Sequence, residues 1–284
     1  MSEQQPITPE LRAWIIEQAT AGHRPEAVLQ SMRASGWNED SAIAALESVL
    51  AGYLDEKARA AALPPPVRVP DPLPQGTRTT LWAGDREVQV LVNLLTPRVV
   101  VFGQLLSDDE CDAVIALAAK RLARSETVQT ETGGSEVNEA RTSQGMFFER
   151  GEHPVVARIE RRMAALLDWP LENGEGLQVL HYKPGAEYKP HYDYFDPVHP
   201  GSATILQRGG QRVGTLVMYL NTPKKGGGTT FPDVGLEVAP IKGNAVFFSY
   251  DRPHVSTRSL HGGAPVIEGE KWVATKWLRE REFI

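Results

Sequence analysis

Two side chains in the stretch HYKPGAEYKPHYDYF could bind a metal ion. His191 and Asp193 lie there, separated by one residue. In an extended strand, successive side chains point to opposite faces, so these two project from one face, about 7 Å apart along the strand. An imidazole and a carboxylate are two of the three ligands in the two-histidine, one-carboxylate set that binds non-haem iron(II). The sequence therefore predicts a metal site if another part of the chain supplies a second histidine.

The downstream sequence offers two such histidines and an unusual lysine. His254 and His261 both follow the first pair of ligands, and their types alone do not decide between them. Lys271 begins the strand-like pattern KWVATKW, where a buried ammonium would need an anionic partner. A dicarboxylate such as 2-oxoglutarate would be such a partner: Lys271 could hold its distal carboxylate while its keto-acid end chelates iron.

Composition is typical of a soluble globular protein with one large domain and a small one. The chain has 284 residues, of which 41% are hydrophobic and 23% charged. A net charge of −6 gives no reason to expect nucleic-acid binding. The single cysteine, Cys111, excludes an intramolecular disulfide and a Cys-ligated cluster. Without a signal-like N-terminus or a run of about 18 apolar residues, we expect no membrane association and a cytoplasmic location.

Residues 8–53 predict a small three-helix module. Thr8 and Pro9 form a helix start, Gly22 ends that helix, and a Gly36-Trp37 turn precedes the last helix. This pattern resembles a ubiquitin-associated-type bundle. We expect a helical bundle that docks on the main domain or on a protein partner, with ubiquitin binding as the alternative.

Residues 54–76 predict a linker. An Ala- and charge-rich tail of the last helix gives way to LPPPVRVPDPLPQG, whose prolines prevent helix formation and favour an extended, semi-rigid spacer. Residues 77–284 predict an α+β domain, with many short strands separated by Gly/Pro turns and supporting helices such as Pro154–Leu167. Such strands are typical of a sandwich, a barrel or a jelly roll, and a jelly roll (double-stranded β-helix) could carry His191 and Asp193 on one strand. Polar, Gly-containing stretches at 125–140 and 197–211 predict flexible loops at the mouth of the site, where they could act as lids.

From about Pro97 to its end the chain resembles the prolyl 4-hydroxylase catalytic domain of the iron(II)- and 2-oxoglutarate-dependent dioxygenases. The resemblance runs in unbroken order through FGQLLSDDEC, RTS, HYKPGAEYKPHYDYF, RVGTLVMYLN, GGGTTFPDVGLEVAPIKGNAVFF and SLHGGAPVIEGEKWVATKWLRE. In that family the second metal-binding histidine lies ten residues before the 2-oxoglutarate lysine. His261 and Lys271 have this spacing, so the resemblance favours His261 over His254.

The resemblance implies roles for further residues. Tyr182 and Thr215 would contact the 2-oxoglutarate carboxylate, and Tyr188 would face the substrate. A peptide groove would be lined by Arg141, Ser143, Arg212 and Trp277. Each has a structural alternative, since the aromatic residues could be core residues, the threonine a strand residue and the arginines members of surface ion pairs.

The implied reaction is hydroxylation of a peptidyl proline, as in procollagen-proline 4-dioxygenases, coupled to oxidative decarboxylation of 2-oxoglutarate to succinate and CO2. It would use Fe(II) and O2, with ascorbate as a candidate reductant. One alternative is a dioxygenase that acts on another side chain, a free amino acid or a small metabolite. A second is an inactive jelly-roll adaptor that recruits partners through its N-terminal helices.

Overall fold

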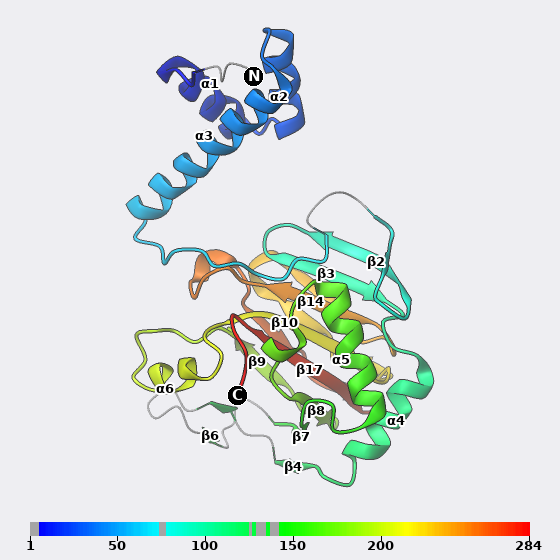
Figure 1. The fold of residues 1–284 in the computed structure, drawn as a ribbon. Coiled ribbons are helices and arrows are strands. Elements are labelled where there is room, and N and C mark those ends of the chain that lie inside the picture. Colours follow the sequence, from blue (N-terminus) through cyan, green and yellow to red (C-terminus); the bar gives the residue numbers. More distant parts are fainter. Residues whose placement is uncertain (1–5, 74–77, 125–126, 129–134, 137–141) are drawn as a thin grey trace. The chain divides into compact units, whose positions relative to one another are not determined.

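The computed structural model describes the whole chain except residues 1–5, 74–77, 125–126, 129–134 and 137–141 (Figure 1). The chain divides into two compact units, Met1–Pro65 and Pro66–Ile284. None of the helices in the described part of the chain is long and apolar enough to cross a membrane.

The first unit consists of α1 (Pro9–Thr20), α2 (Pro25–Ala34) and α3 (Glu39–Ala60). The side chain of Thr8 caps α1 by accepting a hydrogen bond from the Leu11 amide at 3.2 Å. The helices share a small core that includes Ile15, Met32 and Ala42. Helix α3 continues past residue 53, where the predicted module ends, because the following residues are good helix formers with no glycine or proline before residue 63.

The second unit contains a nine-stranded antiparallel sheet, in the order β1-β2-β3-β14-β10-β17-β8-β7-β4. The strands of this large sheet are, in that order, Thr80–Trp82, Glu87–Leu94, Arg98–Gly103, Ala245–Ser249, Arg212–Tyr219, Lys271–Arg279, Leu177–Tyr182, Gln144–Phe148 and Ala123–Arg124.

A four-stranded antiparallel sheet has the order β13-β12-β15-β9, formed by Leu236–Val238, Thr229–Phe231, His261–Gly263 and Tyr188–His191. Two short pairs join β11 (Lys225–Gly226) to β16 (Val266–Glu268) and β5 (Thr127–Val128) to β6 (Ser135–Glu136). Antiparallel sheets with helices confirm the expected mixture of helix and strand. The predicted loop 197–211 contains a short helix, α6 (Ser202–Gln207), and most of the predicted loop 125–140 lies outside the described residues.

Helices α4 (Asp108–Ala118) and α5 (Pro154–Leu167) lie along one face of the large sheet (Figure 1). Ser107 and Glu110 form a capping box that starts α4. The apolar face of α5 packs with alternate side chains of β17, such as Trp272 and Ala274, in the main core. Because strand side chains alternate between faces, the intervening side chains of β17 point to the opposite face, which carries the site described below.

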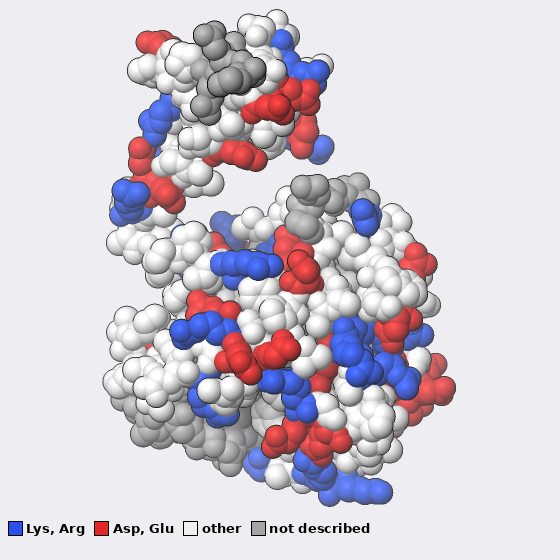
Figure 2. All heavy atoms as spheres, viewed as in Figure 1, with Lys and Arg blue, Asp and Glu red and all other residues white. Residues whose placement is uncertain are grey.

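The chain also has three short 3-10 helices, Leu171–Asn173, Pro232–Val234 and Val255–Thr257. Charged side chains of both signs are interspersed on the face shown in Figure 2. Beneath the surface, the buried Arg162 of α5 forms two-pronged contacts with Glu110 and Asp85, with N–O distances of 2.7–2.8 Å. This network ties α5 to α4 and to the turn before β2.

The end of the predicted linker differs from a free spacer. Residues 66–73 belong to the second unit, where the Val67 amide donates to the Asp251 carbonyl at 2.8 Å. Leu73 is buried in the main core, and the side chain of Asp71 pairs with Arg98. The prolines keep this segment extended, as expected, but its interleaved apolar residues bind it to the surface of the sheet unit.

Candidate active site

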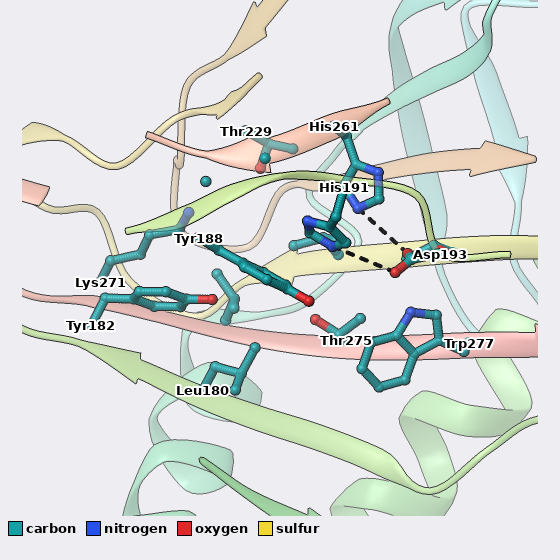
Figure 3. Close-up of a pocket in the computed structure, with 15 residues that line it drawn as sticks. Leu180, Tyr182, Tyr188, His191, Asp193, Thr229, His261, Lys271, Thr275 and Trp277 are labelled. Atoms are coloured by element: carbon teal, nitrogen blue, oxygen red, sulfur yellow. Dashed lines mark hydrogen bonds and ion pairs between the residues drawn. The ribbon is translucent and has the colours of Figure 1, made fainter. Parts of the chain in front are cut away.

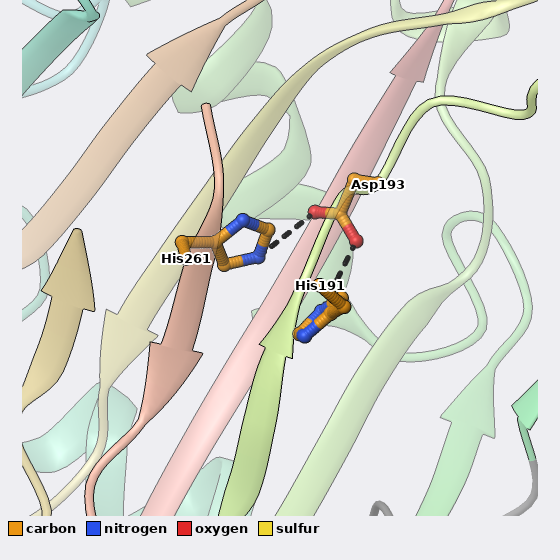
Figure 4. Close-up of side chains that lie close together, drawn as sticks. All are labelled: His191, Asp193 and His261. Carbon is orange, nitrogen blue, oxygen red and sulfur yellow. Dashed lines mark ion pairs between the residues drawn. The ribbon is translucent and has the colours of Figure 1, made fainter. Parts of the chain in front are cut away.

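His191, Asp193 and His261 lie together, with one ligand atom from each inside a cluster no more than 4.8 Å across (Figure 4). The two histidines are direct partners in the antiparallel pair β9–β15, which explains how residues 70 positions apart meet. Asp193 follows the end of β9, in a bend. The sequence predicts a strand that continues to Phe195. Instead, the Gln211 side chain accepts a hydrogen bond from the Phe195 amide and donates one to the Phe195 carbonyl, each at 2.7 Å, so these backbone groups bond to a side chain and not to a neighbouring strand.

The hydrogen bonds of the histidine rings decide which nitrogen faces the cluster. Nδ1 of His191 lies 2.8 Å from the Lys189 carbonyl, and Nδ1 of His261 lies 3.0 Å from the Ser259 carbonyl. A carbonyl only accepts hydrogen bonds, so a neutral ring carries its proton on Nδ1 and has a lone pair on Nε2. The Nε2 atoms lie 3.6 Å and 3.4 Å from the carboxylate oxygens of Asp193.

Burial lowers the pKa of His261 to about 4, so this ring is neutral at neutral pH. Burial alone would raise the pKa of Asp193, but His261, His191 and Arg212 together hold it well below its usual range, so the carboxylate stays ionised. The Nε2 atoms of two imidazoles and an ionised carboxylate thus converge on one point. This donor set fits a divalent transition metal, which would supply the missing positive charge.

The cluster forms one wall of a pocket between the two larger sheets, with a volume of about 440 Å³ including its open mouth (Figure 3). Strand β17 contributes every second side chain to it: Lys271, Val273, Thr275 and Trp277. Side chains of a strand alternate between its two faces, so a strand with one face toward the pocket contributes every second residue.

Lys271 lies in this pocket and is only 4% exposed. Its cross-strand partner is Tyr182 of β8, and its ammonium lies 5.3 Å from the centre of the tyrosine ring. Burial lowers the pKa of Lys271 to about 8, against a smaller opposite effect of Glu237. Among the described residues, no carboxylate comes within ion-pair distance of this ammonium. The Lys271 ammonium is therefore a buried cation that lines the same pocket as the His191, Asp193 and His261 cluster. An acidic ligand that reaches from the cluster to this ammonium would supply the anion that it lacks.

Two predicted substrate-side residues also line the pocket. The ring of Tyr188 stacks on His191, with centroids 3.7 Å apart and planes at 26°. Trp277 is 6% exposed, and its indole Nε1 has no hydrogen-bond partner in the described part of the protein. The aromatic rings could therefore contact a ligand that is largely apolar.

Three predicted positions differ from the expectation, and a fourth lies outside the described residues. Thr215 lines the pocket, but its hydroxyl donates to Asp193 Oδ2 at 2.7 Å. Arg212 does not line the pocket: it forms a two-pronged ion pair with Glu175, at 2.6 and 2.9 Å, and its guanidinium lies over Trp277, 4.1 Å from the ring centre. Ser143 is buried and does not line the pocket, and Arg141 lies outside the described residues.

His254 caps the short helix Val255–Thr257, with its Nδ1 accepting from the Ser256 amide at 3.1 Å, and takes no part in the metal-type cluster.

Tyr250, which follows β14, was not predicted as a site residue. Its hydroxyl lies 2.9 Å from the hydroxyl of Thr215. No local pattern marks it, because its partner is 35 residues away and only the pairing of β10 with β14 brings them together.

Residues 177–279 match the family described as the 2OG-Fe(II) oxygenase superfamily. These residues include every member of the cluster, together with Lys271 and Trp277. The fold and the site define the protein as a 2-oxoglutarate-dependent dioxygenase.

The chain is similar to prolyl 4-hydroxylases from Arabidopsis thaliana. Prolyl 4-hydroxylase 5 is 41% identical over 222 residues, which cover 70% of this chain and 74% of that protein. Prolyl 4-hydroxylase 1 is 40% identical over 225 residues, covering 70% and 78%. The crystal structure of a viral collagen prolyl hydroxylase from Paramecium Bursaria Chlorella virus-1, in its 2OG complex, superimposes with a TM-score of 0.50 at 32% identity, covering 64% of this chain and 95% of that one. The chain belongs to the prolyl 4-hydroxylase family.

Proposed function

We propose that this protein hydroxylates proline residues in peptides or proteins, coupled to decarboxylation of 2-oxoglutarate to succinate and CO2. The observation that carries the proposal is one pocket holding both the His191, Asp193 and His261 cluster and the buried ammonium of Lys271. Similarity to plant prolyl 4-hydroxylases supports proline as the target.

Each side chain has a defined task in this proposal. His191, Asp193 and His261 hold iron(II), which with 2-oxoglutarate and dioxygen supplies the oxidation that converts a C–H bond to C–OH. The Lys271 ammonium pairs with the distal carboxylate of 2-oxoglutarate, and Tyr182 beside it limits where that carboxylate can lie. Because both side chains are buried, they hold the co-substrate away from bulk water.

The substrate-side wall is aromatic. Tyr188, stacked on His191, and Trp277 present flat surfaces that suit a pyrrolidine ring. These groups would hold one C–H bond of the ring near the metal, so the protein contributes mainly orientation and exclusion of water.

The experiment is a turnover assay with Fe(II), 2-oxoglutarate and O2 over a library of proline-containing peptides. We expect succinate release coupled to a product heavier by one oxygen atom, with ascorbate, the proposed reductant, sustaining turnover. Free proline and other amino acids serve as matched substrates. Coupled oxidation of a free amino acid, with none of any prolyl peptide, would instead establish the small-molecule alternative.

For the first unit we propose a protein-binding role of the ubiquitin-associated type. Its three helices enclose a core of their own, while Ile43 of α3 is 37% exposed. Titration of the full chain with ubiquitin, with Ile43→Glu as the matched variant, tests this role. Saturable binding that the variant weakens is the expected result; no binding at millimolar ubiquitin would exclude this role.

The inactive-adaptor alternative requires that Asp193→Ala leave succinate production unchanged.

A further inference from the structure

The carboxylate of Asp193 lacks the backbone support that the two histidines have. Both histidines lie on paired strands, and both have Nδ1 fixed by a backbone carbonyl. Asp193 lies in a bend after β9, so side-chain contacts must hold its orientation. Its closest hydrogen-bond partner is the hydroxyl of Thr215, at 2.7 Å from Oδ2.

The direction of the hydrogen bonds around Thr215 follows from counting protons. A threonine hydroxyl has one proton, and an ionised carboxylate can only accept, so this proton lies between Thr215 and Asp193. The second contact of the Thr215 oxygen, to the Tyr250 hydroxyl at 2.9 Å, must then be donated by Tyr250. The result is a directed chain from Tyr250 to Thr215 to Asp193.

Both hydroxyls are shielded from water, which would otherwise compete for these bonds. Thr215 is 1% exposed and Tyr250 is 2% exposed. The Tyr250 amide donates to the Val213 carbonyl at 3.1 Å, and its ring packs near Phe248 and Tyr194, with centroids 6.3 and 6.1 Å away. Tyr250 is thus a fixed donor, and a charge-assisted hydrogen bond in this dry environment strongly restrains the carboxylate.

A competing partner for the carboxylate lies nearby. A terminal nitrogen of Arg212 is 4.0 Å from Asp193 Oδ1, just beyond hydrogen-bond distance. A small rotation of an unrestrained carboxylate would shorten this ion pair to hydrogen-bond distance and would draw oxygen atoms away from the two Nε2 atoms. The hydrogen bond from Thr215 opposes that rotation from the other oxygen.

We propose that Thr215 and Tyr250 are positioning residues that hold the Asp193 carboxylate toward the two histidines and thereby set the affinity for the metal ion. This role differs from the contact with 2-oxoglutarate expected for Thr215 from sequence. It rests on the metal site of the proposed function but not on the choice of substrate.

The test measures binding of Mn(II) to the metal-free full chain by calorimetry, without 2-oxoglutarate. Thr215→Val keeps the shape of the side chain and removes the hydroxyl, and we expect its Mn(II) affinity to fall about 10- to 100-fold, the usual effect of losing an outer-shell partner of a ligand. Thr215→Ser, which restores the donor, should lie within about threefold of the wild type. Tyr250→Phe removes only the outer bond and should have a smaller effect in the same direction.

Thr229 offers a matched control in the same pocket. Its hydroxyl is also buried and bonded to a tyrosine, accepting from Tyr219 at 2.8 Å, and its one hydrogen bond in the described structure is not to a member of the cluster. Thr229→Val should therefore leave Mn(II) affinity within about twofold. Circular dichroism of each variant verifies that the fold is kept; if Thr215→Val does not fold, Tyr250→Phe decides the matter.

Two outcomes would overturn the proposal. One is unchanged Mn(II) affinity in Thr215→Val with a raised KM for 2-oxoglutarate, the pattern of a co-substrate contact. The other is an equal loss of affinity in Thr229→Val, which would indicate a general effect of pocket packing. Failure to oxidise any prolyl peptide would refute the proposed function and leave this metal-binding pattern intact, so the two can be told apart.

Discussion

Replacing Lys271 by methionine tests the centre of the proposed mechanism, because it removes the charge while keeping an unbranched side chain. Burial lowers the pKa of Lys271 from 10.5 to about 8, which corresponds to about 3 kcal/mol of unfavourable burial for the ammonium. A bound carboxylate would offset this cost by pairing with the ammonium. Lys271→Met should therefore weaken 2-oxoglutarate binding by about 3 kcal/mol, or roughly 100-fold in Kd.

The same substitution should stabilise the protein when no 2-oxoglutarate is present. Methionine fills the site without a buried charge, so the free energy of unfolding should rise by up to about 3 kcal/mol. Because the pKa of Lys271 is lower in the folded than in the unfolded chain, the wild-type penalty is fully present below pH 8 and fades as pH rises toward 10.5. The gain in stability from Lys271→Met should shrink over that interval.

Calorimetry with 2-oxoglutarate and thermal unfolding with and without it measure both effects. The control is Lys276→Met combined with Glu160→Gln, which removes a buried ion pair of β17 on the opposite, helix-covered side. This double variant should leave 2-oxoglutarate affinity within about threefold of the wild type. Wild-type-like affinity in Lys271→Met, or a loss just as large in the control, would refute the assigned role of Lys271.

Further substitutions address the other residues of the site. Asp193→Ala should abolish Mn(II) binding and succinate production. His254→Ala should retain both and should lose at most about 1 kcal/mol of stability, because it removes only a helix cap. Loss of metal binding in His254→Ala would contradict the choice of His261 as a ligand. Arg212→Met should lower the free energy of unfolding by about 1.5–3 kcal/mol in urea titrations, because it removes one of the two arginine partners of the buried Glu175 carboxylate and leaves Arg279; a stable variant with only a raised peptide KM would restore the sequence expectation for Arg212. Tyr188→Ala should raise the KM for prolyl peptides more than tenfold with little change in 2-oxoglutarate affinity, and Tyr188→Phe should behave like the wild type if the ring surface is what matters.

Local sequence was informative wherever the required chemistry is local. The helix start at Thr8, the capping box at Ser107 and the apolar stripe of α5 follow from residue types at fixed spacing. The HxD pair and Lys271 were identified for the same reason, as unusual polar groups in strand-like surroundings. The choice of His261 over His254 came from a spacing shared with a family, and the structure brings His261, not His254, to the cluster.

Contacts that depend on strand pairing could not be predicted from local sequence. Alternation shows that Thr215 and Arg212 lie on β10, but not that one reaches Asp193 and the other reaches Glu175. Nothing local distinguishes Tyr250 from any other aromatic residue at the end of a buried strand. Its role depends on the register of β14 against β10, which fixes which side chains meet.

The sequence by itself therefore determined the kind of chemistry: which residues could bind a metal ion, which cation needed an anion, and which family has that order of motifs. Only the tertiary structure decided how these groups are held. The pairing of β9 with β15 places the two histidines directly opposite each other, the pairing of β8 with β17 places Tyr182 beside Lys271, and a bend after β9 leaves Asp193 dependent on side-chain hydrogen bonds. Residue types are local properties, whereas register and burial arise from contacts between distant parts of the chain.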